Sequence, residues 1–174
     1  EQASSTEFKK DCEPVIMFMP EGSTTHMGGT MRLGLRKTVF QGKPVKTKEE
    51  MSTSQILHGG ASFVDERHRH RYEVNPKYVE RLEKVGYHFV GKDKTGTRME
   101  IFELNRKAHP YFVGCQYHPE LKSRPASPSP LFLGLVLAAS GQLKDVIDDF
   151  QVAPPPRHDT PTPIPRAGSR SSLV

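Results

Sequence analysis

The chain has 174 residues, of which 34% are hydrophobic and 26% are charged, with 15 prolines and no tryptophan. This length suits one domain with a modest core. The apolar content is below the roughly 45–50% of typical globular chains, which predicts that part of the chain stays outside that core. The longest apolar run, Leu131 to Ala139, is too short for a membrane span. The net charge of +5 makes nucleic acid a candidate partner, although the basic residues are spread along the chain.

Neither the N-terminus nor the cysteine content indicates a secreted protein. Residues 1–5 contain no basic stretch followed by an apolar one, so we expect no signal peptide, and the missing initiator Met indicates a piece of a longer protein. Two cysteines, Cys12 and Cys115, are too few for a disulfide framework. We therefore expect a reducing, cytoplasmic setting.

In chain order, the first half predicts mainly extended segments. Val15 to Met19 is a short continuous apolar run, typical of a strand buried on both faces. Polar and apolar side chains alternate over residues 30–34, which places Met31 and Leu33 on one face of a half-exposed strand. Residues 63–74 are a longer extended candidate.

The second half alternates between helices and strands. Pro76 suits the first turn of a helix that runs to about Val85 and ends at Gly86. Strands are expected over residues 87–90, 98–104 and 111–117, with a hairpin-like turn between the first two, and one or two helices over residues 129–150. This set predicts an α/β fold, with a mixed sheet and flanking helices.

The composition changes after Phe150. Residues 151–174 contain six prolines with Ser and Arg between them and few apolar side chains. Such a segment cannot offset the entropy of its own ordering. We therefore expect a folded portion over residues 1–150 and a disordered tail over residues 151–174.

Three groups of residues have patterns typical of functional sites, and the first is Tyr117-His118-Pro119-Glu120. Because Pro119 keeps His118 out of the α region, His118 and Glu120 are expected to project from one face of an extended chain. A histidine oriented by a carboxylate is the base half of a nucleophilic triad. Taken alone, however, the pair is more typical of the polar end of a surface strand.

Neither cysteine is a convincing nucleophile for this pair. Three residues along a strand, at roughly 3.3 Å per residue, place Cys115 about 10 Å from His118 and on the other face. Cys12 lies in a polar loop between two carboxylates, which disfavour its thiolate. We therefore expect Cys115 to be a packed, inert thiol and Cys12 to be unreactive.

The second group is the basic stretch over residues 66–74. Alternation places three arginines on one face and two histidines with a tyrosine on the other: Arg67, Arg69 and Arg71 against His68, His70 and Tyr72. A guanidinium held on a strand is suited to bind a carboxylate. Two histidines two positions apart, without a third ligand nearby, do not predict a metal site. The interleaved aromatics of a nucleic-acid surface are missing as well.

The third group, Ser4-Ser5-Thr6-Glu7-Phe8, places an acidic residue after three hydroxyl side chains. The pattern is that of a helix cap or of a polar terminus, and by itself it favours neither.

Taken together, these segments resemble the glutaminase domain of CTP synthase. The resemblance covers roughly residues 4–140 and rests on Ser5-Thr6-Glu7-Phe8, Met19-Pro20-Glu21, residues 27–34, residues 66–75, residues 116–120 and Ser123-Arg124-Pro125. His-Pro-Glu is shared by the wider class I glutamine amidotransferases. Gly-Gly-Thr-Met-Arg-Leu-Gly and Arg-His-Arg-His-Arg point to CTP synthase in particular.

The resemblance implies the C-terminal part of an incomplete class I glutamine amidotransferase domain, in which a Cys-His-Glu triad hydrolyses L-glutamine. It implies that His118 is the general base and acid and that Glu120 orients it. Arg71 would hold the carboxylate of glutamine, and Glu7 would accept hydrogen bonds from its ammonium group. In the family, the nucleophilic cysteine and the oxyanion hole precede the Ser-Thr-Glu-Phe stretch and would lie before Glu1. The chain alone is therefore expected to be inactive.

In this family the ammonia passes to a separate synthetase domain, which aminates UTP with ATP and Mg²⁺, so we expect no cofactor and no metal in this chain. The expected partners are L-glutamine and the chain's own synthetase domain or the full-length subunits of a homo-oligomer, without membrane or nucleic acid. Two alternatives stay open. One is a non-catalytic glutaminase-like module that binds full-length subunits, and the other is a basic nucleic-acid-binding domain, which salt-sensitive retention on heparin would indicate.

Overall fold

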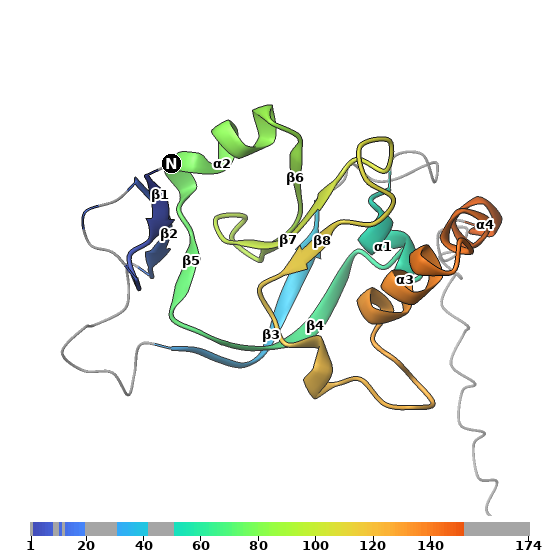
Figure 1. The fold of residues 1–174 in the computed structure, drawn as a ribbon. Helices are drawn as coiled ribbons and strands as arrows, with labels where there is room; N and C mark the ends of the chain where they lie inside the picture. The colour runs from blue at the N-terminus through green and yellow to red at the C-terminus, as the bar shows by residue number, and fades with distance from the viewer. Residues whose placement is uncertain (1, 9–10, 12, 20–30, 42–50, 152–174) are drawn as a thin grey trace, which may run out of the picture.

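The computed structural model describes residues 2–8, 11, 13–19, 31–41 and 51–151. These residues form two β-sheets with helices around them (Figure 1). The smaller sheet has the order β1-β2-β5 and consists of β1 (Ala3–Ser5), β2 (Glu13–Phe18) and β5 (Tyr72–Val74). Since β1 runs parallel to β2 and β5 runs antiparallel to it, this sheet is mixed.

The larger sheet is antiparallel and has the strand order β4-β3-β6-β7-β8. Its strands are β3 (Arg32–Phe40), β4 (Phe63–His70), β6 (Tyr87–Asp93), β7 (Met99–Leu104) and β8 (Val113–Cys115). After β8 the chain crosses back to the other edge. The Gln116 amide donates to the Glu100 carbonyl of β7, and the His118 amide donates to the Arg67 carbonyl of β4, each at 2.9 Å. Residues 116–118 therefore join the two edges of this sheet.

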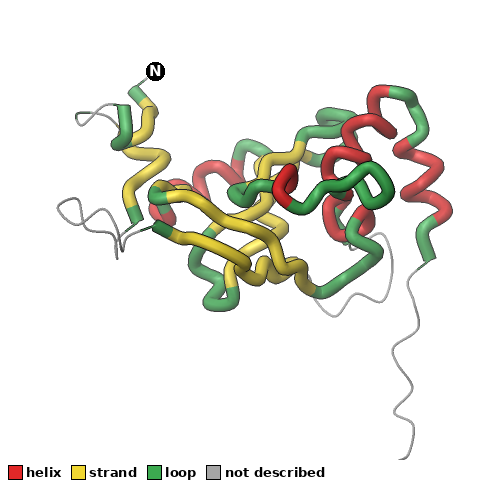
Figure 2. Tube along the Cα trace, turned by 90° about the horizontal axis from the view of Figure 1, so that it is seen from below, coloured by secondary structure: helices red, strands yellow, loops and turns green. Residues whose placement is uncertain are grey.

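Helices cover the ends of the larger sheet. They are α1 (Thr53–Leu57), α2 (Pro76–Lys84), α3 (Pro130–Ala139), α4 (Leu143–Asp149) and the short 3-10 helix η2 (Pro119–Leu121). Figures 1 and 2 show α1, α3 and α4 together at one end of the larger sheet, with the smaller sheet at the opposite end. None of the helices in the described residues is long and apolar enough to cross a membrane.

The hydrophobic core has two parts. The first lies against the larger sheet and α3 and consists of Phe40, Ile101, Tyr117 and Leu131. The second lies between α1 and α4 and consists of Met51, Ile56, Leu143 and Ile147. At Gly134 of α3 a Cβ would lie 2.4 Å from a methyl of Leu57, so glycine is required where α3 approaches α1.

Local signals in the sequence located most of these elements, and the expected α/β class is confirmed. Helix α2 begins at Pro76, directly after its N-cap Asn75, and Gly86 follows its end at a φ of +100°. The hairpin between β6 and β7 and the two helices after residue 129 are also present.

One expectation about burial was wrong. Strand β2 is only half-buried over residues 14–18, because neither hydrophobic cluster of the described residues includes a residue of β2. In β3, Leu33 and Arg32 lie on opposite faces, as predicted: Leu33 points to solvent and is 55% exposed, whereas Arg32 and Thr38 face inward toward Glu100 of β7. Burial of the Glu100 carboxylate thus decided which face of β3 is inside.

Two elements, β1 and α1, were not predicted. Ser4 and Ser5 belong to β1 rather than to a helix cap, and the Ser5 hydroxyl accepts a hydrogen bond from the Glu7 amide in the turn that follows. The predicted tail, Cys12 and the Gly28-Gly29 segment lie outside the described residues, so the domain boundary after Phe150 stays a prediction.

Candidate active site

The structure brings the His118 and Glu120 side chains together. His118 follows the buried Tyr117, and its amide is anchored to β4. Pro119 and Glu120 then begin η2, which turns the chain so that His118 Nδ1 lies 2.7 Å from Glu120 Oε1. Both side chains keep contact with solvent, with exposures of 40% and 54%. The pair therefore stands at the surface, on a backbone that the sheet holds in place.

The electrostatics of this pair determine the charge of Glu120 and which ring nitrogen of His118 carries the proton. The Glu120 backbone amide and the His118 ring lower the pKa of the Glu120 carboxyl, so it is ionised at neutral pH. An ionised carboxylate can only accept hydrogen bonds. Nδ1 of His118 therefore carries the proton, and Nε2 presents its lone pair away from Glu120, as a general base requires.

Cys115 has the opposite character. Its Sγ donates to the Tyr117 carbonyl at 3.5 Å, and its side chain packs against the core of the larger sheet. Burial, followed by the nearby carboxylates of Glu66 and Glu120, raises the pKa of its thiol to about 12. Cys115 is thus a protonated thiol at neutral pH, which agrees with the expectation that it is packed and inert.

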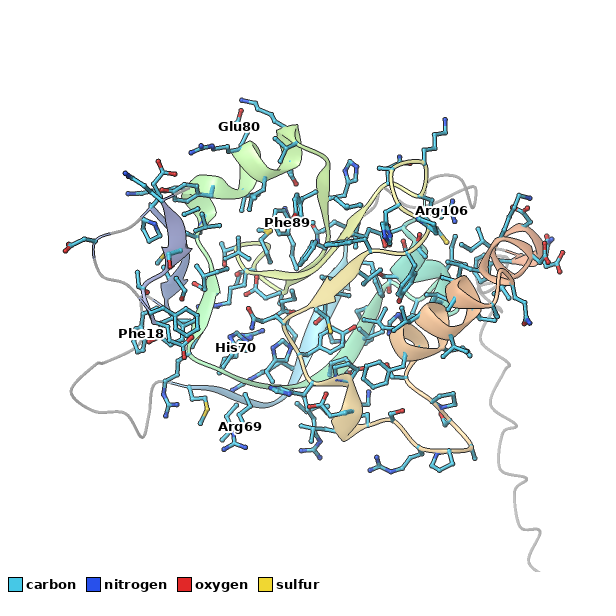
Figure 3. The ribbon with its side chains drawn as sticks, in the orientation of Figure 1. Phe18, Arg69, His70, Glu80, Phe89 and Arg106 are labelled. Atoms are coloured by element: carbon cyan, nitrogen blue, oxygen red, sulfur yellow. The ribbon has the colours of Figure 1, made fainter. Side chains whose placement is uncertain are left out.

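Arg71 lies at the bend where the chain passes from β4 to β5. In β4 the predicted alternation holds, because Arg67 and Arg69 are exposed and His68 is buried; Figure 3 shows Arg69 pointing away from the molecule and His70 pointing inward. The Arg71 carbonyl accepts a hydrogen bond from the Met19 amide at 2.9 Å. Arg71 is therefore half-buried at the junction of the two sheets.

Strand pairing places Glu7 at the same end of the smaller sheet as Arg71. Strand β1 runs parallel to β2, so Glu7, after β1, lies near the end of β2; the Phe18 amide donates to the Thr6 hydroxyl at 3.2 Å. Phe18 in turn pairs with Tyr72, the residue after Arg71. Arg71 lies four positions after Arg67, whose carbonyl accepts the hydrogen bond of the His118 amide, so the backbone span is at most about 13 Å at roughly 3.3 Å per residue. The pairing therefore places Glu7 at the end of the smaller sheet where the chain arrives from β4, the strand to which His118 is anchored.

A buried polar cluster behind this region was not predicted. The Glu100 carboxylate, with a side chain only 1% exposed, accepts hydrogen bonds from Arg32 Nη2 and Thr38 Oγ1, each at 2.6 Å. Burial raises the pKa of Glu100, and the bonds from Thr38 and Arg32 oppose that shift. Its partners lie more than 60 residues away in the chain, so no local pattern could have indicated the cluster. Within the described ranges, no group of three or more His, Cys, Asp or Glu side chains has the arrangement of a metal site.

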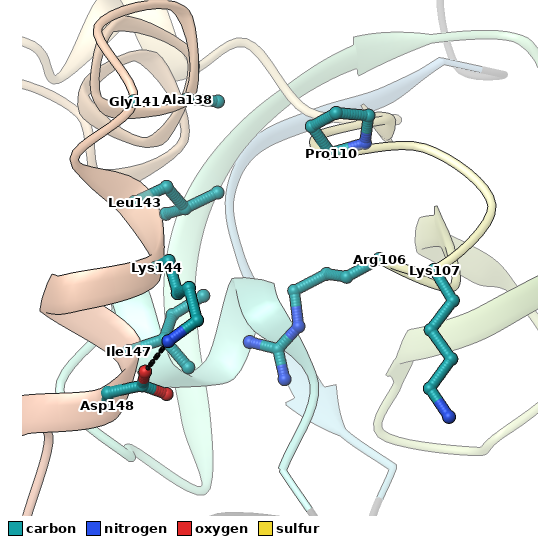
Figure 4. Close-up of a pocket in the computed structure, with 9 residues that line it drawn as sticks. All are labelled: Arg106, Lys107, Pro110, Ala138, Gly141, Leu143, Lys144, Ile147 and Asp148. Carbon is teal, nitrogen blue, oxygen red and sulfur yellow. Dashed lines mark hydrogen bonds and ion pairs between the residues drawn. The ribbon is translucent and has the colours of Figure 1, made fainter.

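A cavity of about 430 Å³ lies elsewhere, between the loop after β7 and helices α3 and α4 (Figure 4). Its floor is apolar, with Leu143 and Ile147, and its charged groups stand at the exposed rim. One of these, Lys144, is already paired with Asp148. None of the predicted site residues lines this cavity.

Known proteins that are similar to this chain belong to one family. The family described as "Glutamine amidotransferase class-I" matches residues 2–138. CTP synthase 2 of Saccharomyces cerevisiae (strain YJM789) is 53% identical over 156 residues, which are 87% of this chain and 26% of the relative. CTP synthase 2 of Bos taurus is 53% identical over 142 residues, which are 81% of this chain and 23% of the relative. This chain thus spans about a quarter of the length of the curated relatives it matches.

Among solved structures, the glutaminase domain of Trypanosoma brucei CTPS with bound acivicin matches with a TM-score of 0.69 and 31% sequence identity. The match covers 81% of this chain and 52% of that chain. The alignment with the relatives and the fold point to one group of proteins. The chain belongs to the class I glutamine amidotransferase family and, within it, matches the glutaminase domain of CTP synthase.

Proposed function

We propose that this chain forms the base half of the glutaminase site of a CTP synthase, an enzyme that hydrolyses glutamine and uses the ammonia for the ATP-dependent amination of UTP to CTP. The observation that carries the proposal is the 2.7 Å contact between His118 Nδ1 and Glu120 Oε1, in a chain of the glutamine amidotransferase family. A histidine oriented in this way offers an unprotonated Nε2, the group with which a triad activates its nucleophile.

In the proposed reaction, His118 Nε2 takes the proton of a cysteine thiol while the sulfur attacks the side-chain amide of glutamine. His118 then gives this proton to the leaving nitrogen, so the C–N bond breaks, ammonia departs and a glutamyl thioester remains. A water molecule, deprotonated by the same Nε2, cleaves the thioester to glutamate and thiol. Glu120 keeps the ring in its tautomer and stabilises the imidazolium that forms at each transfer.

Arg71 and Glu7 are proposed to bind the α-carboxylate and the α-ammonium group of glutamine. A guanidinium binds a carboxylate through two parallel hydrogen bonds, and a carboxylate accepts hydrogen bonds from an ammonium group. The support is the strand pairing, which places both residues at one end of the smaller sheet.

The nucleophilic thiol is proposed to come from outside the described residues, because Cys115 is protonated and directed at a main-chain carbonyl. We infer that the 174 residues alone do not hydrolyse glutamine. ATP, UTP and Mg²⁺ are proposed to bind to a synthetase domain in another part of such an enzyme.

A chimera tests these roles. The segment of yeast CTP synthase 2 that matches this chain is replaced by the corresponding residues of this chain, and CTP formation is measured with glutamine and with ammonia. We expect His118→Ala to lower glutamine-dependent turnover by about 10²- to 10⁴-fold and to leave ammonia-dependent turnover unchanged. The exposed His88 of β6 is the matched control, and His88→Ala should change neither activity. Equal loss of both activities in His118→Ala would contradict the assigned role.

A second experiment uses the chain by itself. We expect the purified 174-residue chain to release no more glutamate from glutamine than its His118→Ala variant does. Robust turnover that His118→Ala abolishes would show that these residues contain the thiol, and Cys12→Ala and Cys115→Ala would then identify it. Association with an intact CTP synthase that leaves the activity of that synthase unchanged would instead support a non-catalytic module.

A further inference from the structure

His68 and His70 are titratable groups near the proposed site that the reaction does not use, in the strand to which the His118 amide is bonded. His68 is 1% exposed and His70 is half-buried, and both lie on the inner face of β4. His68 Nδ1 lies 3.1 Å from His70 Nε2, and His70 Nδ1 lies 2.9 Å from the Tyr72 carbonyl oxygen. The two rings therefore form a hydrogen-bonded chain that ends on the backbone just after Arg71.

The direction of this chain follows from its last acceptor. A carbonyl oxygen cannot donate, so His70 Nδ1 must carry a proton, and in a neutral ring His70 Nε2 is then an acceptor. His68 Nδ1 must therefore donate to it, which leaves His68 Nε2 without a proton when that ring is neutral. The nearest carboxylate oxygen, on Glu100, is 3.9 Å from His68 Nε2, which is too far for a hydrogen bond.

The surroundings keep both rings neutral. Burial lowers the pKa of His68 to about 3 and the pKa of His70 to about 4, and the charges of neighbouring cations add to both shifts. The groups that face the rings are Arg32 and Arg36 on β3, Arg98 before β7, Glu100 on β7, and His118. Since most of these groups are cations, a further positive charge on His68 or His70 would be unfavourable.

The two rings also connect the two parts of the proposed site. The His68 ring lies edge-on to Tyr117, with ring centroids 5.9 Å apart, and Tyr117 directly precedes His118. At the other end, the hydrogen bond from His70 to Tyr72 spans Arg71, whose own carbonyl is fixed by the Met19 amide. We propose that His68 and His70 form a neutral relay, by which we mean the hydrogen-bonded chain of the two uncharged rings, and that this relay fixes the position of Arg71 relative to His118. His70 is then a positioning residue for Arg71, the proposed carboxylate clamp for glutamine.

This inference rests on the proposed role of Arg71, but the hydrogen-bonded state of the relay can be measured without any reaction. In the ¹⁵N-labelled 174-residue chain at neutral pH, long-range ¹H–¹⁵N correlations of the histidine rings report which nitrogen carries the proton. We expect His68 and His70 both to be neutral with the proton on Nδ1. An Nε2-protonated His70, or a doubly protonated His68 paired with Glu100, would overturn the relay.

The positioning role is measured in the chimera described above. His70→Phe removes both hydrogen bonds, whereas the amide of His70→Asn can still donate to the Tyr72 carbonyl. We expect His70→Phe to raise KM for glutamine about ten- to a hundredfold with a smaller change in kcat, and His70→Asn to restore most of the loss. His88→Phe, on the exposed side of β6, is the control for introducing the ring.

Arg71→Ala separates failure of this inference from failure of the proposed function. If Arg71→Ala leaves KM for glutamine unchanged, the carboxylate clamp itself is wrong. If Arg71→Ala raises KM while His70→Phe leaves it unchanged, the clamp stands and the positioning role of His70 is wrong. If His70→Phe and His70→Asn raise KM equally, the hydrogen bond to Tyr72 is not what positions Arg71.

Discussion

The comparison of His118 with His68 and His70 shows how one residue type takes different roles at different positions in the fold. His118, at the end of the crossing segment, keeps 40% of its side chain in solvent and pairs with a carboxylate. His68 and His70 face inward, where burial lowers the pKa of each ring below that of free imidazole. The difference arises from position in the fold, because His68 and His70 lie on the inner face of β4, whereas His118 lies after β8 at the start of η2.

These lowered pKa values predict that the chain loses stability in mild acid. The unfolded chain restores both histidine pKa values to about 6.5, so between about pH 4 and pH 6.5 it binds more protons than the native state does. The free energy of unfolding should therefore fall as the pH falls from about 7 to 5, by at most about 1.4 kcal/mol per pH unit for each histidine. Urea unfolding measured across this range checks the prediction.

Two substitutions test this pH dependence, and a third is the control. His68→Asn and His70→Asn should each make the decline shallower, whereas His88→Asn, at an exposed position, should not. The raised pKa of Glu100 acts in the opposite direction, because the native state retains that proton to higher pH, and it offsets part of the effect toward the acid end. A decline unchanged in both relay variants would contradict the assignment to these histidines.

At the scale of elements, α1 shows how a helix that is too short to form alone is fixed by a distant strand. It has five residues, fewer than an isolated helix needs in water. The Glu103 carboxylate of β7 accepts hydrogen bonds from the amides of Thr53 and Ser54 at 2.9 and 3.1 Å, and from the Ser54 hydroxyl at 3.0 Å. A negative group at a helix N-terminus is also favoured by the helix dipole.

Glu103→Ala should therefore lower the free energy of unfolding by about 1–3 kcal/mol, because it leaves buried donors at the start of α1 without an acceptor. Glu80 of α2 provides the control, because its ion pair with Lys84 lies at the surface, with side chains 82% and 70% exposed, and is worth about 0.3–0.5 kcal/mol. Urea unfolding of Glu103→Ala and Glu80→Ala compares the two sites. The capping role fails if both variants lose the same small amount.

For the molecule as a whole, the position of the His118–Glu120 pair depends on joining the two edges of the larger sheet. Besides the His118 amide, Lys122 makes this connection. Its Nζ donates to the Asp65 carbonyl at 2.5 Å and to the Glu66 carboxylate at 3.3 Å. Burial raises the pKa of Glu66, and the charge of Lys122 opposes that shift. The lysine thus ties the segment after η2 to β4.

Lys122→Met should destabilise the chain by about 1–3 kcal/mol, because it leaves the buried Glu66 carboxylate without its cation. Lys144→Met is the matched control, since Lys144 pairs with Asp148 on the solvent side of α4, with an 82% exposed side chain. Both variants are compared by urea unfolding, and the His118 ring resonances report whether the pair moves. A Lys122→Met loss no larger than that of Lys144→Met would contradict this role.

The sequence by itself determined the parts of this protein that depend on neighbouring residues. Pro76 and Gly86 mark the two ends of α2, because capping acts over a few residues. Pro119 predicted that His118 and Glu120 lie together, but on an extended chain. In the structure Pro119 and Glu120 begin the 3-10 helix η2, and this turn brings the two side chains together. The expectation that Cys115 is inert, based on its position three residues from His118 along a strand, agrees with the raised pKa of its buried thiol.

The tertiary structure alone decided the features whose partners lie far away in the chain. Helix α1 depends on Glu103, about 50 residues away, and the outward side of Leu33 depends on Glu100, 68 residues from the Arg32 that it binds. The hydrogen-bonded chain from His68 to Tyr72 needed the bend at Arg71 and the ring of Tyr117. Burial of a polar group must be matched by a hydrogen-bond partner, and only the folded chain determines which distant residue supplies it.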